Sequence, residues 1–387
     1  MYIFVLPISG GRFVSQLAGL EYLCENEIKP NITLASSGGN VAALIASAAN
    51  WKWAGIERIA KDLTNDLFAE QWSNISMISS VIGWFQASRY NEGKNITGFL
   101  NKYFTNQIIM NDEIWTGTYN KDQKRTCLFC NKKTSILDVS HINYDLTQST
   151  LPIFAQGDIN LIGKYGTASA SIPSLVPPQK IIGSWYEDGG VSSSSPLTVM
   201  TDPILNYVIE NKTSMHLVYI NSINLSNHNE KSINNIIDNI KVTTEDFIRS
   251  SVVNDRLAAY KLLKNFERSC IISQNNIDSD DNLKENLGKS KKSDLNTISE
   301  NFDGMINYEE FICNYENIKK IKTIQSMINY SLLEIYPNVK YEINIINFNG
   351  NDVINEINRA YKDLRCRFWF IYSGNSPIID DLISSLK

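Results

Sequence analysis

Long apolar runs are missing from this chain of 387 residues. No segment reaches the roughly 18 consecutive apolar residues that a membrane-spanning helix needs. The apolar N-terminus lacks a preceding basic region and is ended by Pro7, so we interpret residues 2–7 as a first core strand rather than a signal peptide. The sequence therefore predicts a cytoplasmic protein that meets membranes only peripherally.

An excess of positive charge is also missing. The chain has 36 Lys and Arg against 41 Asp and Glu, which gives a net charge of −5. Such a balance provides no basic field that would attract nucleic acid. The densest basic cluster, residues 289–292, is too short to act as a polybasic lipid-binding segment. We expect no nucleic-acid partner, and the composition names no protein partner or activator.

Cysteine and histidine are scarce. Six unevenly spaced cysteines in a chain of this length favour reduced thiols. Cys127, Cys130 and His141 have the spacing of metal ligands. In a strand, however, residues three apart point to opposite faces, so a core role is favoured and no metal site is expected. The three histidines are His141, His216 and His228, and none lies in a motif typical of catalysis.

The most informative feature present is a serine on a tight turn. Residues 31–35 have the pattern of a buried strand, and residues 40–49 are rich in strong helix formers. The small residues between them, Ala35 to Gly39, allow a sharp bend with Ser37 at its apex. This arrangement is typical of the nucleophile elbow, G-x-S-x-G, with Ala35 replacing the first glycine. Ser37 is the candidate nucleophile, and Ser36 would take that role only if the turn were shifted by one residue.

A base and an oxyanion site are needed to activate such a serine. Asp188 follows a strand-like run at residues 181–186 and precedes two glycines that permit close approach of the backbone. Its carboxylate could serve as general base. Between the first strand and the first helix, Ser9, Gly10, Gly11 and Arg12 form a loop whose amides could bind a developing anion.

Alternating patterns of strand and helix surround these motifs. Strand patterns at residues 2–7, 31–35 and 216–220 and helix patterns at 16–23, 40–49 and 200–210 predict a parallel sheet covered by helices. Two strand-like runs between residues 113 and 140 predict a hairpin.

Four motifs occur here in the order found in patatin-like lipid acyl hydrolases, and the resemblance covers roughly residues 1–200. The motifs are Ser9–Arg12, Ala35–Gly39, Ala168–Pro173 and Asp188–Val191. The resemblance implies an α/β fold of three layers, with a mostly parallel central sheet flanked by helices. It also implies a Ser-Asp dyad in place of a triad.

Carried over by position, the resemblance assigns a role to each site residue. Ser37 would be the nucleophile and Asp188 the base. Gly10, Gly11 and Arg12 would form the oxyanion loop, and Ala35 and Gly39 would flank the elbow. The implied substrate is a phospholipid or another acyl lipid met at a membrane surface, and no metal or organic cofactor is implied.

Two competing interpretations stay open. The loop at residues 9–12 has fewer glycines than the family's loop, which is the reason to consider a non-catalytic module that binds lipid or protein. His216 could instead complete a triad, because Ser37, Asp188 and His216 follow the chain order of α/β-hydrolases. Against a triad, His216 begins a strand-like run.

We expect an acyl hydrolase domain over residues 1–225 and a C-terminal extension over residues 226–387. The extension should be helical at 231–267 and 308–333, with a polar loop at about 273–303, a late strand at 341–346 and a short apolar run at 368–371. Residues 51–104 have a helical and aromatic pattern, in which Trp84 and Phe85 could form a lid.

Overall fold

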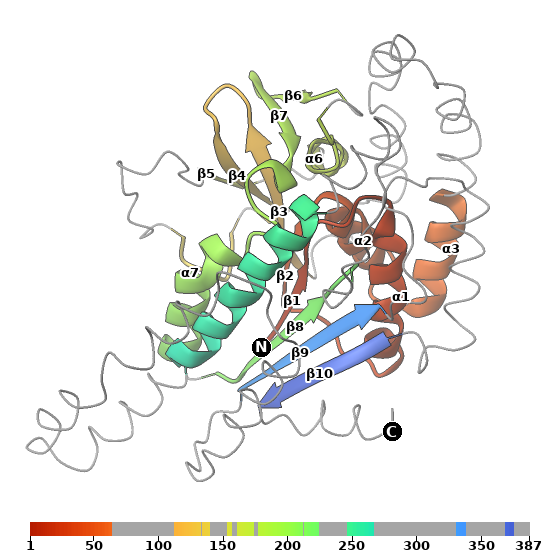
Figure 1. Cartoon of the computed structure of the whole chain (residues 1–387), viewed down its shortest axis with the longest axis vertical. Coiled ribbons are helices and arrows are strands. Elements are labelled where there is room, and N and C mark those ends of the chain that lie inside the picture. The colour runs from red at the N-terminus through yellow and green to blue at the C-terminus, as the bar shows by residue number, and fades with distance from the viewer. Residues whose placement is uncertain are drawn as a thin grey trace, which may run out of the picture.

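One central sheet organises the part of the chain that the computed structural model describes (Figure 1). The described residues are 1–63, 112–132, 134–139, 153–156, 161–173, 177–211, 213–223, 246–266, 330–337 and 368–374. The strands are β1 (Tyr2–Leu6), β2 (Ile32–Ser36), β3 (Glu113–Asn120), β4 (Arg125–Cys130), β5 (Ile153–Gln156), β6 (Gln179–Ile181), β7 (Ser184–Asp188), β8 (Met215–Ile220), β9 (Tyr330–Pro337) and β10 (Phe368–Gly374). The helices are α1 (Phe13–Glu25), α2 (Ser37–Ala48), α3 (Trp53–Leu63), α6 (Ile162–Ser169), α7 (Leu197–Glu210) and residues 246–266, with short 3-10 turns η1 (Gly10–Arg12) and η5 (Gly189–Val191).

The strand order is β10-β9-β8-β1-β2-β3-β4-β5, and β7 pairs with both β3 and β6. The strands from β9 to β3 in this order are parallel to one another. The pairs β9–β10, β3–β4, β3–β7 and β6–β7 are antiparallel. The pair β4–β5 is parallel. The centre of the sheet is therefore parallel, with antiparallel pairs outside it, which agrees with the mostly parallel sheet predicted from the sequence.

Each face of the sheet packs against its own layer of helices. Phe4 and Leu6 of β1 belong to the core shared with α1, α2 and α3. Ile3 and Val5, which point the other way, join the core under α7 and the helix at 246–266. Figure 1 shows these two groups of helices on opposite sides of the sheet. The predicted α/β fold of three layers is confirmed.

Helix α2 lies wholly inside the molecule. Its residues from Ser37 to Ser47 are all buried, and most of them are small or aliphatic. A helix that is apolar all round needs protein on every side. Small side chains such as Ala42 and Ala43 let the helix approach the sheet closely, which holds its N-terminus firmly beside the end of β2.

Two predicted elements differ from the structure. The strand-like run at 181–186 is a hairpin, because the chain turns at Ile182 and Gly183, both of which have positive φ. The helix predicted over 308–333 is wrong for residues 330–333, which belong to β9. Leu332 and Leu333 are both fully buried, which suits a strand covered on both faces. The predictions for Trp84, Phe85, the polar loop and the strand at 341–346 lie outside the described residues.

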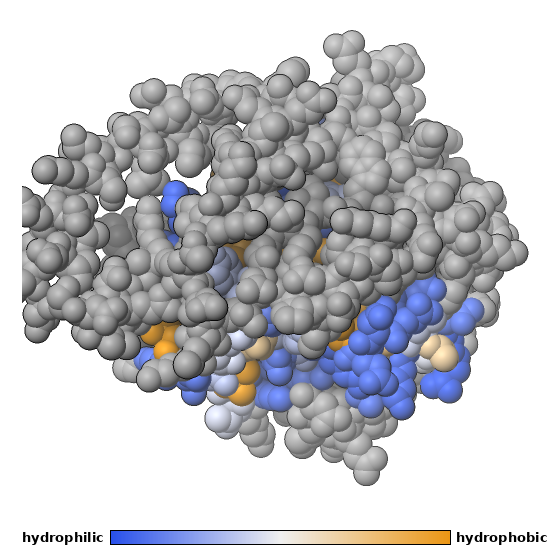
Figure 2. Space-filling model, turned by 90° about the horizontal axis from the view of Figure 1, so that it is seen from below, coloured by the Kyte–Doolittle hydropathy of each residue, from blue (hydrophilic) through white to orange (hydrophobic). Residues whose placement is uncertain are grey.

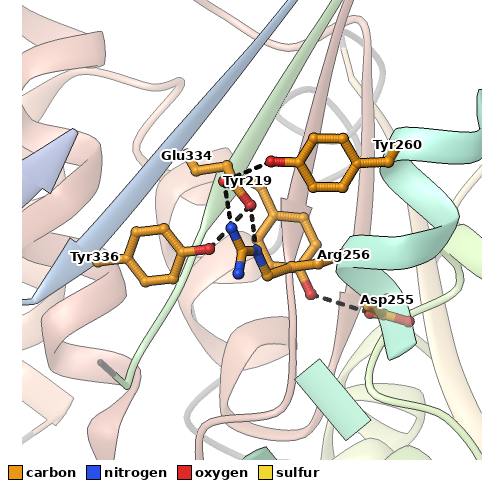
Figure 3. Close-up of polar contacts among 6 residues, drawn as sticks. All are labelled: Tyr219, Asp255, Arg256, Tyr260, Glu334 and Tyr336. Carbon is orange, nitrogen blue, oxygen red and sulfur yellow. Dashed lines mark hydrogen bonds and ion pairs between the residues drawn. The ribbon is translucent and has the colours of Figure 1, made fainter. Parts of the chain in front are cut away.

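The chain beyond residue 225 joins the same sheet through β9 and β10. Within this part, a buried ion pair joins the helix at 246–266 to β9, since Arg256 donates to Glu334 at 2.7 and 2.9 Å. Tyr260 and Tyr336 also donate to the Glu334 carboxylate (Figure 3). The boundary that we predict at residue 225 is thus crossed by one continuous sheet.

No helix among the described residues is long and apolar enough to cross a bilayer. Seen from below, the described residues that are visible are mainly hydrophilic, with small hydrophobic spots between them (Figure 2). The described part of this face is therefore mostly suited to contact with water.

Candidate active site

The two predicted reactive residues come from strands that end at the same point of the sheet. Strand β3 pairs with β4 along one edge. Along its other edge, β2 pairs as far as Gly117, opposite Ser36, and β7 takes over at Thr118, opposite Asp188. Ser37 follows directly on Ser36. The register of β3 therefore places Ser37, the candidate nucleophile, next to Asp188.

Two glycines make this meeting of strand ends sterically possible. A Cβ atom on Gly117 would collide with the Ser36 hydroxyl, and one on Gly189 would collide with the Gly117 carbonyl oxygen. The chain segments at Ser36, Gly117 and Gly189 thus lie in close contact. Gly117 is a requirement of the site that no sequence motif indicates.

Ser37 occupies a strained position at the start of α2. Its φ of 55° lies in the left-handed region, which residues other than glycine rarely adopt. Behind it, side chains on Gly38 and Gly39 would collide with the Gly10 carbonyl and with the backbone of Leu6 and Pro7. Ala35, which replaces the elbow's first glycine, is fully buried in β2. This conformation is the sharp strand-to-helix turn of a nucleophile elbow.

The Ser37 hydroxyl donates a hydrogen bond of 2.7 Å to Oδ2 of Asp188. The other carboxylate oxygen, Oδ1, accepts from the Gly190 amide at 2.7 Å. Asp188 is only 5% exposed. Burial raises the pKa of Asp188 to about 7, although the hydrogen bonds from Ser37 and Gly190 oppose the shift. A carboxylate with this pKa can both accept and return a proton near neutral pH.

Ser169 supports the elbow from the end of α6. Its hydroxyl accepts a hydrogen bond of 2.9 Å from the Ser37 amide and donates one of 2.6 Å to the Gly117 carbonyl. Both partners belong to the junction of β2, β3 and β7 described above. The sequence draws attention to the motif Ala168–Pro173 only through the family resemblance, and the spacing of the motif gives Ser169 no role.

The predicted oxyanion loop lies against the elbow. Gly10 begins η1 with a φ of 53°, and the Arg12 amide donates to the Ser9 carbonyl at 3.0 Å. The contact between Gly10 and Gly38 brings this loop to the N-terminus of α2. Gly11 lies within η1, and the Arg12 side chain is 2% exposed. The segment before the loop is also tied to the segment after Asp188, because the Ile8 amide donates to the Ser194 carbonyl at 2.9 Å.

Comparison with known families agrees with this geometry. Residues 9–201 match the family model of patatin-like phospholipases. This part of the chain belongs to the patatin-like phospholipase family. The matched range contains the elbow, Ser169, Asp188 and the whole loop at residues 9–12.

A viral relative extends the similarity. The chain is 25% identical over 286 residues to an uncharacterized protein of Acanthamoeba polyphaga mimivirus. The alignment covers 70% of this chain and 82% of the viral protein. It therefore reaches beyond the patatin-like domain, although it adds no information on activity.

His216 lies at the wrong end of the patatin-like sheet to act on Ser37. It pairs with Tyr2 at the start of β1, whereas Ser37 follows the end of β2, where Ala35 pairs with Leu6. Four residues along a strand separate these levels by roughly 13 Å. The ring of His216 instead bonds the Ser331 hydroxyl at 2.9 Å. The interpretation of His216 as part of a triad is wrong.

Ser36, Cys127 and Cys130 have structural positions rather than reactive ones. Ser36 is an extended residue at the end of β2, with its hydroxyl close to Gly117, and so the turn is not shifted by one residue. Cys127 and Cys130 lie in different cores on the two faces of β4, as predicted. His141 lies outside the described residues, and within those residues no group of three or more metal-ligating side chains gathers.

Proposed function

We propose that this chain is a lipid acyl hydrolase of the phospholipase A type that acts through a dyad of Ser37 and Asp188. One observation carries the proposal. Ser37 stands at the strained apex of the elbow while its hydroxyl donates to a buried carboxylate whose pKa is raised to about 7. A serine with only a structural role at the start of a helix needs neither a positive φ nor a buried carboxylate partner. The family match points to acyl lipids as substrates.

In the proposed acylation, Ser37 Oγ attacks the ester carbonyl carbon and its proton passes to Asp188 Oδ2. The tetrahedral intermediate collapses, the C–O bond to the leaving alcohol breaks, and Asp188 gives that alcohol the proton. In deacylation, water attacks the acyl-enzyme and gives a proton to Asp188. The carboxyl then returns this proton to Ser37 as the fatty acid leaves, so the enzyme is regenerated.

The developing oxyanion needs backbone N–H donors. We assign this role to the Gly38 amide, which follows the nucleophile at the N-terminus of α2, and to the amides of Gly10 and Gly11. The contact between Gly38 and Gly10 supports the assignment, because it brings the two groups of donors together. Arg12 adds positive charge to the same loop.

A non-catalytic lipid-binding module is the competing function, and the small number of glycines at residues 9–12 is its basis. Labelling with a fluorophosphonate, followed by peptide mapping, separates the two. An activated serine forms an adduct on Ser37 that is absent in Ser37→Ala and much slower to form in Asp188→Asn. Ser192→Ala is a matched control because Ser192 is half-buried and its hydroxyl bonds the nearby Gly189 carbonyl. An unlabelled Ser37 would favour the binding module.

A further inference from the structure

The hairpin that ends in Asp188 carries an unusual share of the exposed hydrophobic surface. Among the described residues, five large hydrophobic side chains are exposed: Ile136, Ile182, Trp185, Val191 and Phe247. Three of them lie between residues 182 and 191, on β7 and the segments that flank it. Ile182 is 82% exposed. This stretch contains the proposed base, Asp188.

Isoleucine is an unfavourable residue for the turn position that Ile182 occupies. It has a φ of 46° and is followed by Gly183 with a φ of 86°. A two-residue turn with both φ values positive favours Asn-Gly, and a β-branched residue there is strained. The side chain gains no burial in return. An apolar residue held out at a strained tip is better explained by a surface that it contacts.

Trp185 and Lys180 lie next to the turn at Ile182 and Gly183. Trp185 is 42% exposed, and the Lys180 ammonium lies 5.7 Å from the centre of its ring. Lys180 and Trp185 face each other across the β6–β7 pair. Tryptophan and lysine side chains together suit the boundary between water and lipid, where the ring enters the headgroup layer and the charge meets phosphate.

A second hairpin places further positive charge beside the first. The turn between β3 and β4 is joined to β7, because the Lys121 amide donates to the Trp185 carbonyl and the Trp185 amide donates to Asp122. Figure 1 shows both hairpin tips at the top of the molecule. The cations on the two tips are Lys121, Lys124, Arg125 and Lys180, and the carboxylates are Asp122 and Glu187. Lys121 forms an ion pair of 2.6 Å with Glu187, which leaves three cations against one carboxylate. This local excess stands out in a chain with a net charge of −5.

We propose that the tips of the β3–β4 and β6–β7 hairpins form a docking surface for anionic phospholipid membranes. Ile182 and Trp185 enter the headgroup region, and the surrounding cations bind lipid phosphates. This inference rests on the proposed function, since it explains how the site meets its substrate. Strand β7 spans about 13 Å from Ser184 to Asp188, so a docked hairpin holds the base within one strand length of the bilayer.

Vesicle co-sedimentation in a Ser37→Ala background tests the docking surface without any turnover. The probe is phosphatidylcholine vesicles with and without phosphatidylserine. The double variant Ile182→Asn/Trp185→Thr should bind the anionic vesicles about tenfold more weakly. Asn suits the positive φ and Thr suits a strand, so the hairpin should fold. Phe247→Gln removes an equally exposed aromatic residue elsewhere and should bind normally.

The outcomes separate this proposal from the proposed function. Lys124→Gln/Lys180→Gln should weaken binding to anionic vesicles only, and added salt should weaken binding by the parent protein. Equal binding by all variants, or no binding by the parent protein, overturns the docking surface. Hydrolysis by the chain with native Ser37 is measured separately, so either proposal can fail while the other survives.

Discussion

At the residue scale, the site depends on one buried carboxylate. Asp188 has no ion-pair partner among the described residues, and its two oxygens are occupied by the Ser37 hydroxyl and the Gly190 amide. Burial costs the charged form free energy, while the two hydrogen bonds recover part of it. The result is a carboxyl group that is half ionised near neutral pH. In our proposal this group, rather than a histidine, accepts the Ser37 proton.

The raised pKa of Asp188 predicts the pH dependence of acylation. Only the ionised carboxylate can accept the Ser37 proton, so activity should rise as pH increases through about 7. The rate of fluorophosphonate labelling, measured from pH 5 to pH 9 (roughly two units on each side of that pKa), should follow a single deprotonation. A flat profile over this range would contradict the assignment of Asp188 as base.

Ser169 provides a second prediction at this scale. In Ser169→Ala the Ser37 amide loses its buried acceptor, which costs about 1–3 kcal/mol and should lower kcat roughly 5- to 150-fold. Ser171→Ala is the matched control, because the Ser171 hydroxyl is also buried but bonds the Thr167 carbonyl within its own helix region. Equal effects of the two substitutions on kcat would remove the special role of Ser169.

Some residues of the candidate site could be predicted from the sequence, and others could not. Ser37 and Asp188 could be singled out because small residues lie on both sides of Ser37 and two glycines follow Asp188, and such residues permit sharp turns of the backbone. Ser169 and Gly117 could not be given roles, since their importance arises only when β3, α6 and the elbow come together. Contacts between distant segments leave no periodic signal in one sequence.

At the scale of elements, the site is the meeting of two strand ends on one edge of β3. Strand β2 enters in parallel and β7 in antiparallel orientation, and both leave the sheet there. The sequence predicts β1, β2 and their helices well, because alternation and helix propensity agree locally. It fails at Ile182, whose positive φ contradicts its own preference, and at β9, where burial on both faces removes alternation.

The link between β9 and the helix at 246–266 gives an element-scale prediction. Arg256→Met leaves the Glu334 carboxylate buried without its cation, which should lower the free energy of unfolding by about 3–5 kcal/mol. Arg256→Met/Glu334→Leu removes both charges and should recover most of that loss. Urea unfolding of the two single variants and the double variant measures the coupling. Additive losses would show that the pair contributes no interaction of its own.

At the scale of the whole molecule, a patatin-like domain and the residues beyond it share one sheet. The order β10-β9-β8-β1-β2 runs from the C-terminal strands straight to the elbow strand. The strands beyond the patatin-like domain therefore extend the sheet on the edge of β1 that faces away from β2. Pairing of this kind could not be predicted from the sequence, since the register between β8 and β9 joins residues more than 100 positions apart.

The central claim is that the whole molecule hydrolyses acyl lipids through Ser37. The most direct measurement is release of fatty acid from phospholipid vesicles by the purified chain and by Ser37→Ala. We predict steady release by the parent protein and a rate lower by about a thousandfold or more in the variant. Equal release by both proteins, or none by the parent protein, would contradict the account.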